Sequence, residues 1–165
     1  MSEQLIFEQR KYAWDYFTLH ATQRLTTFNF YLVLAALLIT GAFTAFKIDF
    51  LHPIVGAGLG LVLAFLSFVF HKLDERNREL VGIGEQALMF LEKEISSGLG
   101  SDQEPHVLQL FLKEKFQTDN LKKQRFCHIL KKHLSYSDCF RCVFIMFGGS
   151  GLVIAAYALF HSLFC

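Results

Sequence analysis

Residues 25–46 read LTTFNFYLVLAALLITGAFTAF and contain no Asp, Glu, Lys or Arg. Residues 50–70 read FLHPIVGAGLGLVLAFLSFVF and are also free of these charges. About 20 helical apolar residues cross the hydrocarbon core of a bilayer, and each strongly apolar side chain favours insertion by roughly 0.3–0.6 kcal/mol. The two runs therefore predict a transmembrane hairpin over residues 25–70. Pro53, which disfavours helix in the residue before it, lies just after the predicted turn.

A third uncharged run covers residues 143–165. Helices in the core of a soluble protein normally keep a polar face, and none of the three runs has one. The predicted fold class is all-α: a polytopic membrane protein with three transmembrane helices and a helical cytoplasmic segment. We expect an amphipathic cytoplasmic arm at 1–24, the hairpin at 25–70, a helical cytoplasmic region at 71–142 and the third span at 143–165.

The overall composition agrees with a membrane protein. Of the 165 residues, 53% are hydrophobic and 19% are charged, whereas about 25% are charged in a typical soluble domain. The 19 Phe residues provide too much apolar surface for a disordered chain. The 16 Lys and Arg exceed the 15 Asp and Glu by one, which excludes a globally basic DNA-binding protein. We expect membrane lipids, and no DNA, among the partners.

The basic residues are sorted along the chain, and this predicts the topology. Fifteen of the 16 lie in residues 1–24 and 71–142, and only Lys47 lies in the hairpin turn. Because cytoplasmic segments carry an excess of Lys and Arg, we expect both segments in the cytoplasm. The predicted location is the inner membrane, multi-pass, with the N-terminus cytoplasmic and the C-terminus on the far side.

The helix of the second span is expected to continue into the cytoplasm as a stalk, because no helix breaker follows Phe70. A 4-3-4-3-4 spacing, typical of a coiled-coil seam, relates Leu73, Asn77, Leu80, Gly84, Ala87 and Leu91. This seam could bind a second copy of the chain or pack within one chain, and the sequence favours neither. In the arm, Trp14 is an aromatic of the kind that prefers the membrane–water interface.

A loop at Gly98–Pro105 separates the stalk from a helix that contains Val107 and Phe116, and residues 118–120 are expected to end that helix and cap the next. That next helix is basic and amphipathic. Its cations are Lys122, Lys123, Arg125, Lys131 and Lys132. Such a helix beside a span usually contacts anionic headgroups, at about 1 kcal/mol per basic residue. A soluble protein partner or a nucleotide-type signal is the alternative.

The spans carry packing motifs and scattered polar residues. Gly56 and Gly60 form GxxxG, which lets membrane helices approach closely, so we expect them in oligomer packing. Three helices cannot enclose an aqueous pore, so a pore would need a ring of subunits. Its lining would have to use Asn29, Thr40, Thr44 or Ser67. Alternatively, these side chains bond to neighbouring backbone inside a closed bundle.

Catalytic and metal-binding patterns are weak. Cys139 and Cys142 have the two-residue gap of zinc sites, but their nearest partners, such as Cys127, are irregularly spaced. We expect reduced thiols, no metal and no cofactor. The sequence contains no nucleophile elbow, phosphate loop or charged residue within a span. These features favour a protein that is not an enzyme and disfavour a coupled transporter.

A series of short motifs resembles SLATT-type membrane effectors of bacterial phage defence, in which a transmembrane hairpin precedes a cytoplasmic helix. The motifs are Trp14-Asp15-Tyr16-Phe17, Leu19-His20-Ala21, Gln23-Arg24, Phe28-Asn29-Phe30 and Lys72-Leu73-Asp74-Glu75-Arg76-Asn77. The layout is also similar to RipA-like octameric membrane proteins, although the third span departs from the two-span pattern.

The resemblance implies a homo-oligomer that perturbs or permeabilises the inner membrane on a cytoplasmic signal. Two alternatives stay open. One is a membrane scaffold that recruits a soluble partner through the basic helix and the Gly98–Pro105 loop. The other is an accessory subunit of a transporter.

Overall fold

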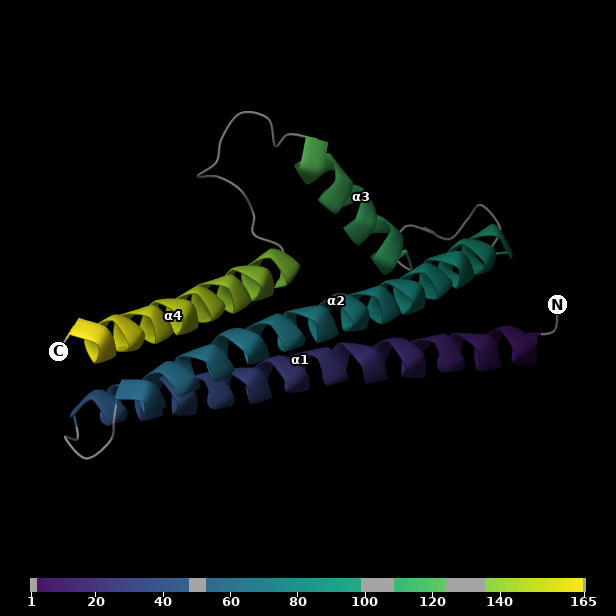
Figure 1. Ribbon diagram of the computed structural model, residues 1–165. Helices are drawn as coiled ribbons and strands as arrows, with labels where there is room; N and C mark the ends of the chain where they lie inside the picture. The colour runs from purple at the N-terminus through teal and green to yellow at the C-terminus, as the bar shows by residue number, and fades with distance from the viewer. Residues whose placement is uncertain (1–2, 48–52, 99–108, 124–135, 165) are drawn as a thin grey trace. The chain divides into compact units, whose positions relative to one another are not determined.

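A computed structural model describes residues 3–47, 53–98, 109–123 and 136–164, and within these ranges the secondary structure is entirely helical (Figure 1). The four helices are α1 (Glu3–Lys47), α2 (Pro53–Gly98), α3 (Leu110–Lys123) and α4 (Tyr136–Phe164). The predicted all-α class is confirmed.

Helices α1, α2 and α4 are each long and apolar enough to cross a membrane. At 1.5 Å per residue, the 45 residues of α1 extend for about 68 Å, more than twice the ~30 Å hydrocarbon core. The first apolar run therefore forms one helix with the arm before it, and the second forms one helix with the stalk after it. The third apolar run lies in α4, which begins seven residues before it, at Tyr136.

The chain divides into two compact units. Unit 1 comprises Met1–Thr22 and Asn77–Leu134, and unit 2 comprises Gln23–Arg76 and Ser135–Cys165. Unit 2 thus holds the three apolar runs, whereas unit 1 holds the N-terminal part of α1, the C-terminal part of α2 and all of α3. The four-part division of the sequence stays a prediction.

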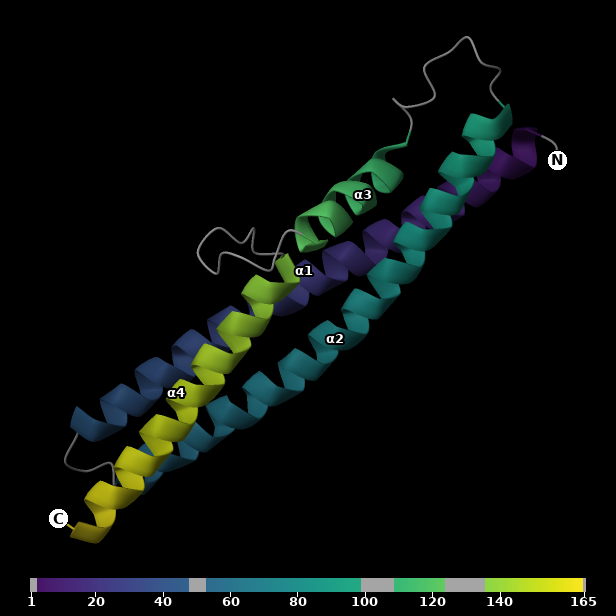
Figure 2. The ribbon, with the colours of Figure 1, turned by 90° about the horizontal axis from the view of Figure 1, so that it is seen from above.

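In unit 2, α4 lies beside α1 and α2 in both ribbon views (Figures 1 and 2). Their shared core is mainly aromatic. The rings of Phe28 and Phe140 stack with centroids 3.8 Å apart, and the buried Tyr31 ring lies 4.7 Å from that of Phe144. Aromatic pairs contribute about 0.5–1.5 kcal/mol beyond the area they bury. They join α4 to the predicted hairpin.

In unit 1, the core is small and joins three helices. Ala13 of α1 packs with Leu88 and Leu91 of α2, and the Phe17 ring lies 5.4 Å from that of Phe111 in α3. The Glu92 carboxylate accepts hydrogen bonds of 3.3 Å from the backbone N–H groups of Phe111 and Leu112. It thereby satisfies donors that the first turn of α3 leaves open, and its charge suits the positive end of the helix dipole.

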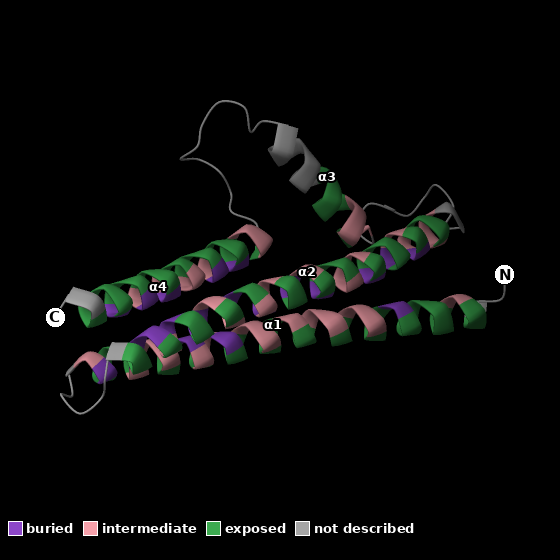
Figure 3. Cartoon of the chain, viewed as in Figure 1, coloured by how far each residue is buried: buried purple, intermediate pink, exposed green. Residues whose placement is uncertain are grey.

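Except for Ala57, the buried residues of α2 follow one stripe with alternating 4- and 3-residue steps (Figure 3). This stripe comprises Gly56, Gly60, Leu63, Ser67, Phe70, Asp74, Asn77, Val81, Gly84, Leu88 and Leu91, of which Val81 is half-buried. A 3.5-residue repeat keeps one face of a helix against its neighbours over many turns. Helix α2 therefore uses this face for contacts within the chain.

The expected helix end at residues 118–120 is wrong, because α3 runs through Thr118, Asp119 and Asn120 without a break. These residues cost only about 0.5 kcal/mol each in a helix interior, too little to end a helix by themselves. Most of the predicted Gly98–Pro105 loop and the later part of the predicted basic helix lie outside the described residues.

Candidate functional site

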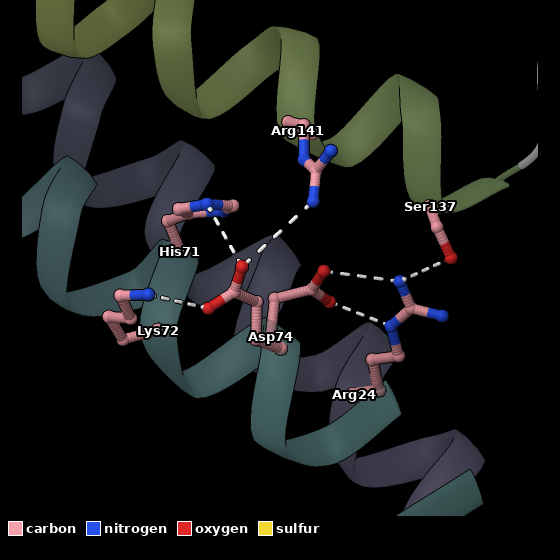
Figure 4. A network of polar contacts seen from close by, with 7 residues as sticks. Arg24, His71, Lys72, Asp74, Ser137 and Arg141 are labelled. Atoms are coloured by element: carbon pink, nitrogen blue, oxygen red, sulfur yellow. Dashed lines mark hydrogen bonds and ion pairs between the residues drawn. The ribbon is translucent and has the colours of Figure 1, made fainter. Parts of the chain in front are cut away.

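At one end of the unit 2 bundle, an ion pair joins α1 to α2 (Figure 4). The Arg24 guanidinium donates to both carboxylate oxygens of Asp74, from Nε at 2.7 Å and from a terminal nitrogen at 3.1 Å. Their side chains are only 13% and 11% exposed. Arg24 also donates to Ser137 Oγ at 3.1 Å and lies 5.1 Å from the centre of the Phe140 ring, both in α4. One arginine thus links all three helices of unit 2.

A second, more exposed network surrounds Glu75. Lys72 Nζ lies 2.7 Å from its Oε2, while His71 Nε2 and a terminal nitrogen of Arg141 lie 3.5 and 3.9 Å from its Oε1. The hydrogen bond from Lys72 lowers the pKa of the Glu75 carboxyl, and the charges of Lys72, His71 and Arg141 lower it further. The lowered pKa favours the ionised form of Glu75, whose contact with Arg141 is an exposed and therefore weak electrostatic link between α2 and α4.

We expect Lys72→Gln to raise the pKa of Glu75 back towards its ordinary value of 4.5, because the strongest of these interactions is lost. The stabilisation from a lowered carboxyl pKa is present above that ordinary value and disappears as the pH falls through the lowered one. Carbon NMR titration of the Glu75 carboxyl in micelles measures the shift. The control is Lys93→Gln, on the same helix, and an unchanged Glu75 titration in Lys72→Gln would contradict the assignment.

Helices α2 and α4 cross at two glycines. A Cβ built on Gly60 would lie 2.6 Å from the Gly151 carbonyl oxygen, and one built on Gly151 would lie 2.6 Å from the Gly60 carbonyl oxygen. Ala64 and Ala155 follow each glycine by four residues and complete two small-xxx-small motifs. Backbones approach this closely only where side chains are absent, which is the way small residues promote packing of membrane helices.

The four candidate pore-lining residues do not lie together. Ser67 is buried in α2, where its Oγ lies 2.8 Å from the Tyr31 hydroxyl and donates to the Leu63 carbonyl. Asn29, Thr40 and Thr44 are exposed on α1. Bonding to neighbouring backbone, the alternative interpretation, describes Ser67, Thr40 and Thr44, although only Ser67 lies inside the bundle.

These three α1 residues belong to a longer outward stripe. Its members follow 3- and 4-residue spacing and are all exposed: Thr26, Asn29, Val33, Ala36, Thr40 and Thr44. Thr40 is nine residues from the buried Tyr31, which at 3.6 residues per turn places it about 180° around the helix. The hydroxyls of Thr40 and Thr44 bond backbone carbonyls four residues earlier. Asn29 has no hydrogen-bond partner among the residues that the structure describes.

The other two helices differ on their exposed faces. Along residues 54–68 the exposed residues of α2 are apolar or glycine, and along 145–160 the same holds for α4 except for the Tyr157 hydroxyl. Phe65 and Phe68 of α2 and Ile145 and Met146 of α4 are each at least 60% exposed. Helices α2 and α4 thus present apolar surfaces, whereas α1 combines the polar groups of its stripe with exposed apolar side chains such as Phe30, Leu37 and Phe43.

The residues predicted for oligomer packing divide between buried and exposed positions. Within the chain, Gly56 lies against the Phe46 ring, Gly60 against Gly151 and Gly84 against Phe17. Asn77 and Leu91 are also buried, Leu80 is half-buried, and Leu73 and Ala87 are exposed. Contacts within the chain therefore use all three of these glycines and bury three of the six seam residues. A role between chains stays a prediction.

The residues predicted to contact the membrane surface or a partner are only partly described. Trp14 is 51% exposed, and its ring lies 6.4 Å from that of Phe111. Lys122 and Lys123 end α3, where their side chains are not described, and Arg125, Lys131 and Lys132 lie outside the described residues. Cys139 and Cys142 are exposed thiols within α4 rather than in a turn.

Sequence reasoning missed the Arg24–Asp74 pair. A signal was available, because Arg24 and Asp74 are equally far along the sequence from residue 49, as are the bonded Tyr31 and Ser67. In an antiparallel helical hairpin, residues equidistant from the turn lie at the same level. The predicted turn therefore also predicts this register.

Three apolar helices long enough to cross a membrane, joined by aromatic, glycine and ion-pair contacts, define a small polytopic helical membrane protein. The chain is 31% identical over 145 residues to CD-NTase-associated protein 19 of Escherichia coli, covering 88% of this chain and 87% of that protein. The chain therefore belongs to the family of CD-NTase-associated protein 19. No family model matches the chain. No solved structure shows significant similarity to it.

Proposed function

We propose that this protein is a homo-oligomeric inner-membrane effector of phage defence that permeabilises the membrane on a cytoplasmic signal. Copies would surround an aqueous path with the outward stripe of α1 facing inward and with α2 and α4 facing lipid. The polar side chains of this stripe carry the proposal, since the exposed faces of α2 along residues 54–68 and of α4 along residues 145–160 carry only the Tyr157 hydroxyl.

The physical argument rests on where polar groups are stable. An amide moved from water to an apolar medium without a hydrogen bond costs about 1–3 kcal/mol by protein mutational data. If the stripe faced lipid, the Asn29 amide would incur this cost, whereas the Thr40 and Thr44 hydroxyls already bond backbone carbonyls. Facing water or a second copy removes the penalty.

The family supports the biological part of the proposal. The name of the Escherichia coli relative associates that protein with a CD-NTase, and an NTase acts on nucleotides. This agrees with the phage-defence association and with a nucleotide-type signal. The signal would act on unit 1, which we place in the cytoplasm by the sorting of basic residues. Helices α1 and α2 each run without a break from unit 1 into unit 2 and could carry a movement between them.

Substituting leucine for alanine at two exposed positions tests the proposal. We expect Ala36→Leu, in the stripe, to reduce ion leakage roughly tenfold, because a ring of leucines narrows and dewets a polar path. Ala156→Leu, on the exposed face of α4, should leave leakage unchanged. The measurement is membrane potential and ion leakage after induced expression, alone and together with the neighbouring genes.

Equal leakage from wild type and Ala36→Leu would refute a path along α1. No leakage from wild type under any of these conditions would refute permeabilisation altogether. Membrane insertion and expression levels of both variants serve as the control, since both exchange one exposed alanine for the same side chain.

A further inference from the structure

An apolar groove of about 260 Å³ lies between α2 and α4 in unit 2. Its walls include Ala64, Phe68, Ile145, Gly148, Gly149 and Leu152. Phe68 and Ile145 are about 60% exposed, so the groove opens to the surroundings of the bundle rather than into its core. In a bilayer these surroundings are lipid chains.

Two glycines keep the groove open. A Cβ built on Gly149 would meet no atom within 4 Å, and one built on Gly148 would lie 3.2 Å from Ser67 Cβ. Gly148 thus allows α4 to approach α2 at the floor, while Gly149 leaves space at the opening. A chain of methylene groups can occupy such a space, whereas a longer side chain at residue 149 would fill it.

The groove ends at a charged cluster. His71 lines it and has one ring nitrogen directed at Glu75, while its other nitrogen, Nδ1, is buried without a hydrogen-bond partner among the described residues. Lys72 lies one turn beyond Phe68 on α2, and Arg141 lies one turn beyond Ile145 on α4. The side chains of these two cations are 58% and 52% exposed.

The position of the two cations matches the level of lipid phosphates. Lys72 follows the last residue of the second predicted span by two positions, and Arg141 precedes the first residue of the third by two. Lys72 and Arg141 carry two positive charges around the single Glu75 carboxylate, and together they offer eight N–H donors. Both cations are more than half exposed and can therefore also contact a group outside the chain.

We propose that the groove binds an anionic glycerophospholipid, with one acyl chain between α2 and α4 and its phosphate between Lys72 and Arg141. Basic sites between transmembrane helices at the cytoplasmic side suit anionic headgroups. The bound lipid bridges α2 and α4 at the end where the Glu75 network also joins them. The site is separate from the outward stripe of α1, so its test is independent of permeabilisation.

The experiment measures lipid binding to the full-length protein. Wild-type protein is placed in nanodiscs of phosphatidylcholine that contain a minority of phosphatidylglycerol. The phosphatidylglycerol carries a photoreactive acyl chain, and the residues that it labels on illumination are mapped. We expect labels concentrated at Phe68, Ile145 and Gly149. Labels spread evenly over the exposed faces of the three helices would overturn the proposal. This part of the experiment uses only the wild-type protein.

Variants then test the headgroup and the chain separately. Lys72→Gln/Arg141→Gln should lower the preference for phosphatidylglycerol over phosphatidylcholine in native mass spectrometry by about tenfold or more, and Lys113→Gln/Lys115→Gln on α3 should not. Gly149→Leu should abolish crosslinking in the groove, and Gly58→Leu, at another open glycine, should not. An unchanged lipid preference in the first variant, or displacement of the lipid by inorganic phosphate alone, would overturn the site.

Discussion

Replacement of Asp74 by alanine lowers the free energy of unfolding by about 3–5 kcal/mol, the largest loss that we expect from a single side chain here. In the wild-type protein the Arg24 side chain is only 13% exposed and lies close to Phe140 and Ser137. The variant leaves its guanidinium in this place without a carboxylate partner. The cost arises mainly from the charge left behind rather than from the pair itself, because taking two ions out of water is expensive even when they meet.

The same reasoning predicts a rescue. In Arg24→Met/Asp74→Leu, neither charge remains, and apolar side chains of comparable size fill the space between α1, α2 and α4. We expect this double variant to recover most of the stability lost in Asp74→Ala, and a strong coupling energy in the double-mutant cycle. Equilibrium unfolding in mixed micelles measures all three proteins, with Glu114→Ala, an exposed carboxylate of α3, as the control.

A loss in Asp74→Ala no greater than that in the control would show that the guanidinium finds water or another partner. A double variant as unstable as the single one would show that packing, and not charge, governs the site.

The second large effect concerns the α2–α4 crossing. We expect Gly60→Ala to cost about 3 kcal/mol, because its Cβ would lie 2.6 Å from the Gly151 carbonyl oxygen and 2.9 Å from the Ala155 nitrogen. Both are backbone atoms, so relief requires the helices to separate. Separation would in turn loosen the stacked pair of Phe28 and Phe140, which holds the same helix to α1.

Gly58→Ala is the matched control for this variant. Gly58 lies two residues away on the same helix, and a Cβ there meets nothing within 4 Å. Since alanine is a better helix former by about 1 kcal/mol, we expect no destabilisation at this position. Gly151→Ala should resemble Gly60→Ala, and the two together should cost less than their sum, because either one already separates the helices. Similar stabilities of Gly58→Ala and Gly60→Ala would refute the crossing.

The helices and most of their extent followed from the sequence. Runs of more than 20 uncharged residues are enough to specify helices that can cross a bilayer, because insertion depends on a sum over side chains and not on their arrangement. The continuation of the second span into a stalk followed from the absence of helix breakers after Phe70. The expected helix end at residues 118–120 was wrong because the low helix propensity of these residues, about 0.5 kcal/mol each, is too small to end a helix.

The sequence did not predict which side chains contact one another, because such contacts depend on the arrangement of residues and not on composition. The seam proposed from Leu73, Leu80 and Ala87 differs by one residue at several positions from the buried stripe through Asp74, Val81 and Leu88. One residue is 100° of rotation about a helix axis, and the apolar pattern of α2 is too rich to distinguish neighbouring faces. Similarly, the sequence predicted Gly56 and Gly60 as contact points, and only packing shows that Gly60 meets Gly151 of α4.

The sequence by itself determined that the chain is all-α, which segments can cross a membrane and which carry the basic residues, since all three depend on composition along the chain. Tertiary structure alone decided how each helix is rotated. Rotation places Asp74 beside Arg24 and Ser67 beside Tyr31, and it leaves Asn29 and Thr40 outside the bundle. The physical reason is that rotation is set by contacts between residues far apart in the chain, which exist only once the helices have packed.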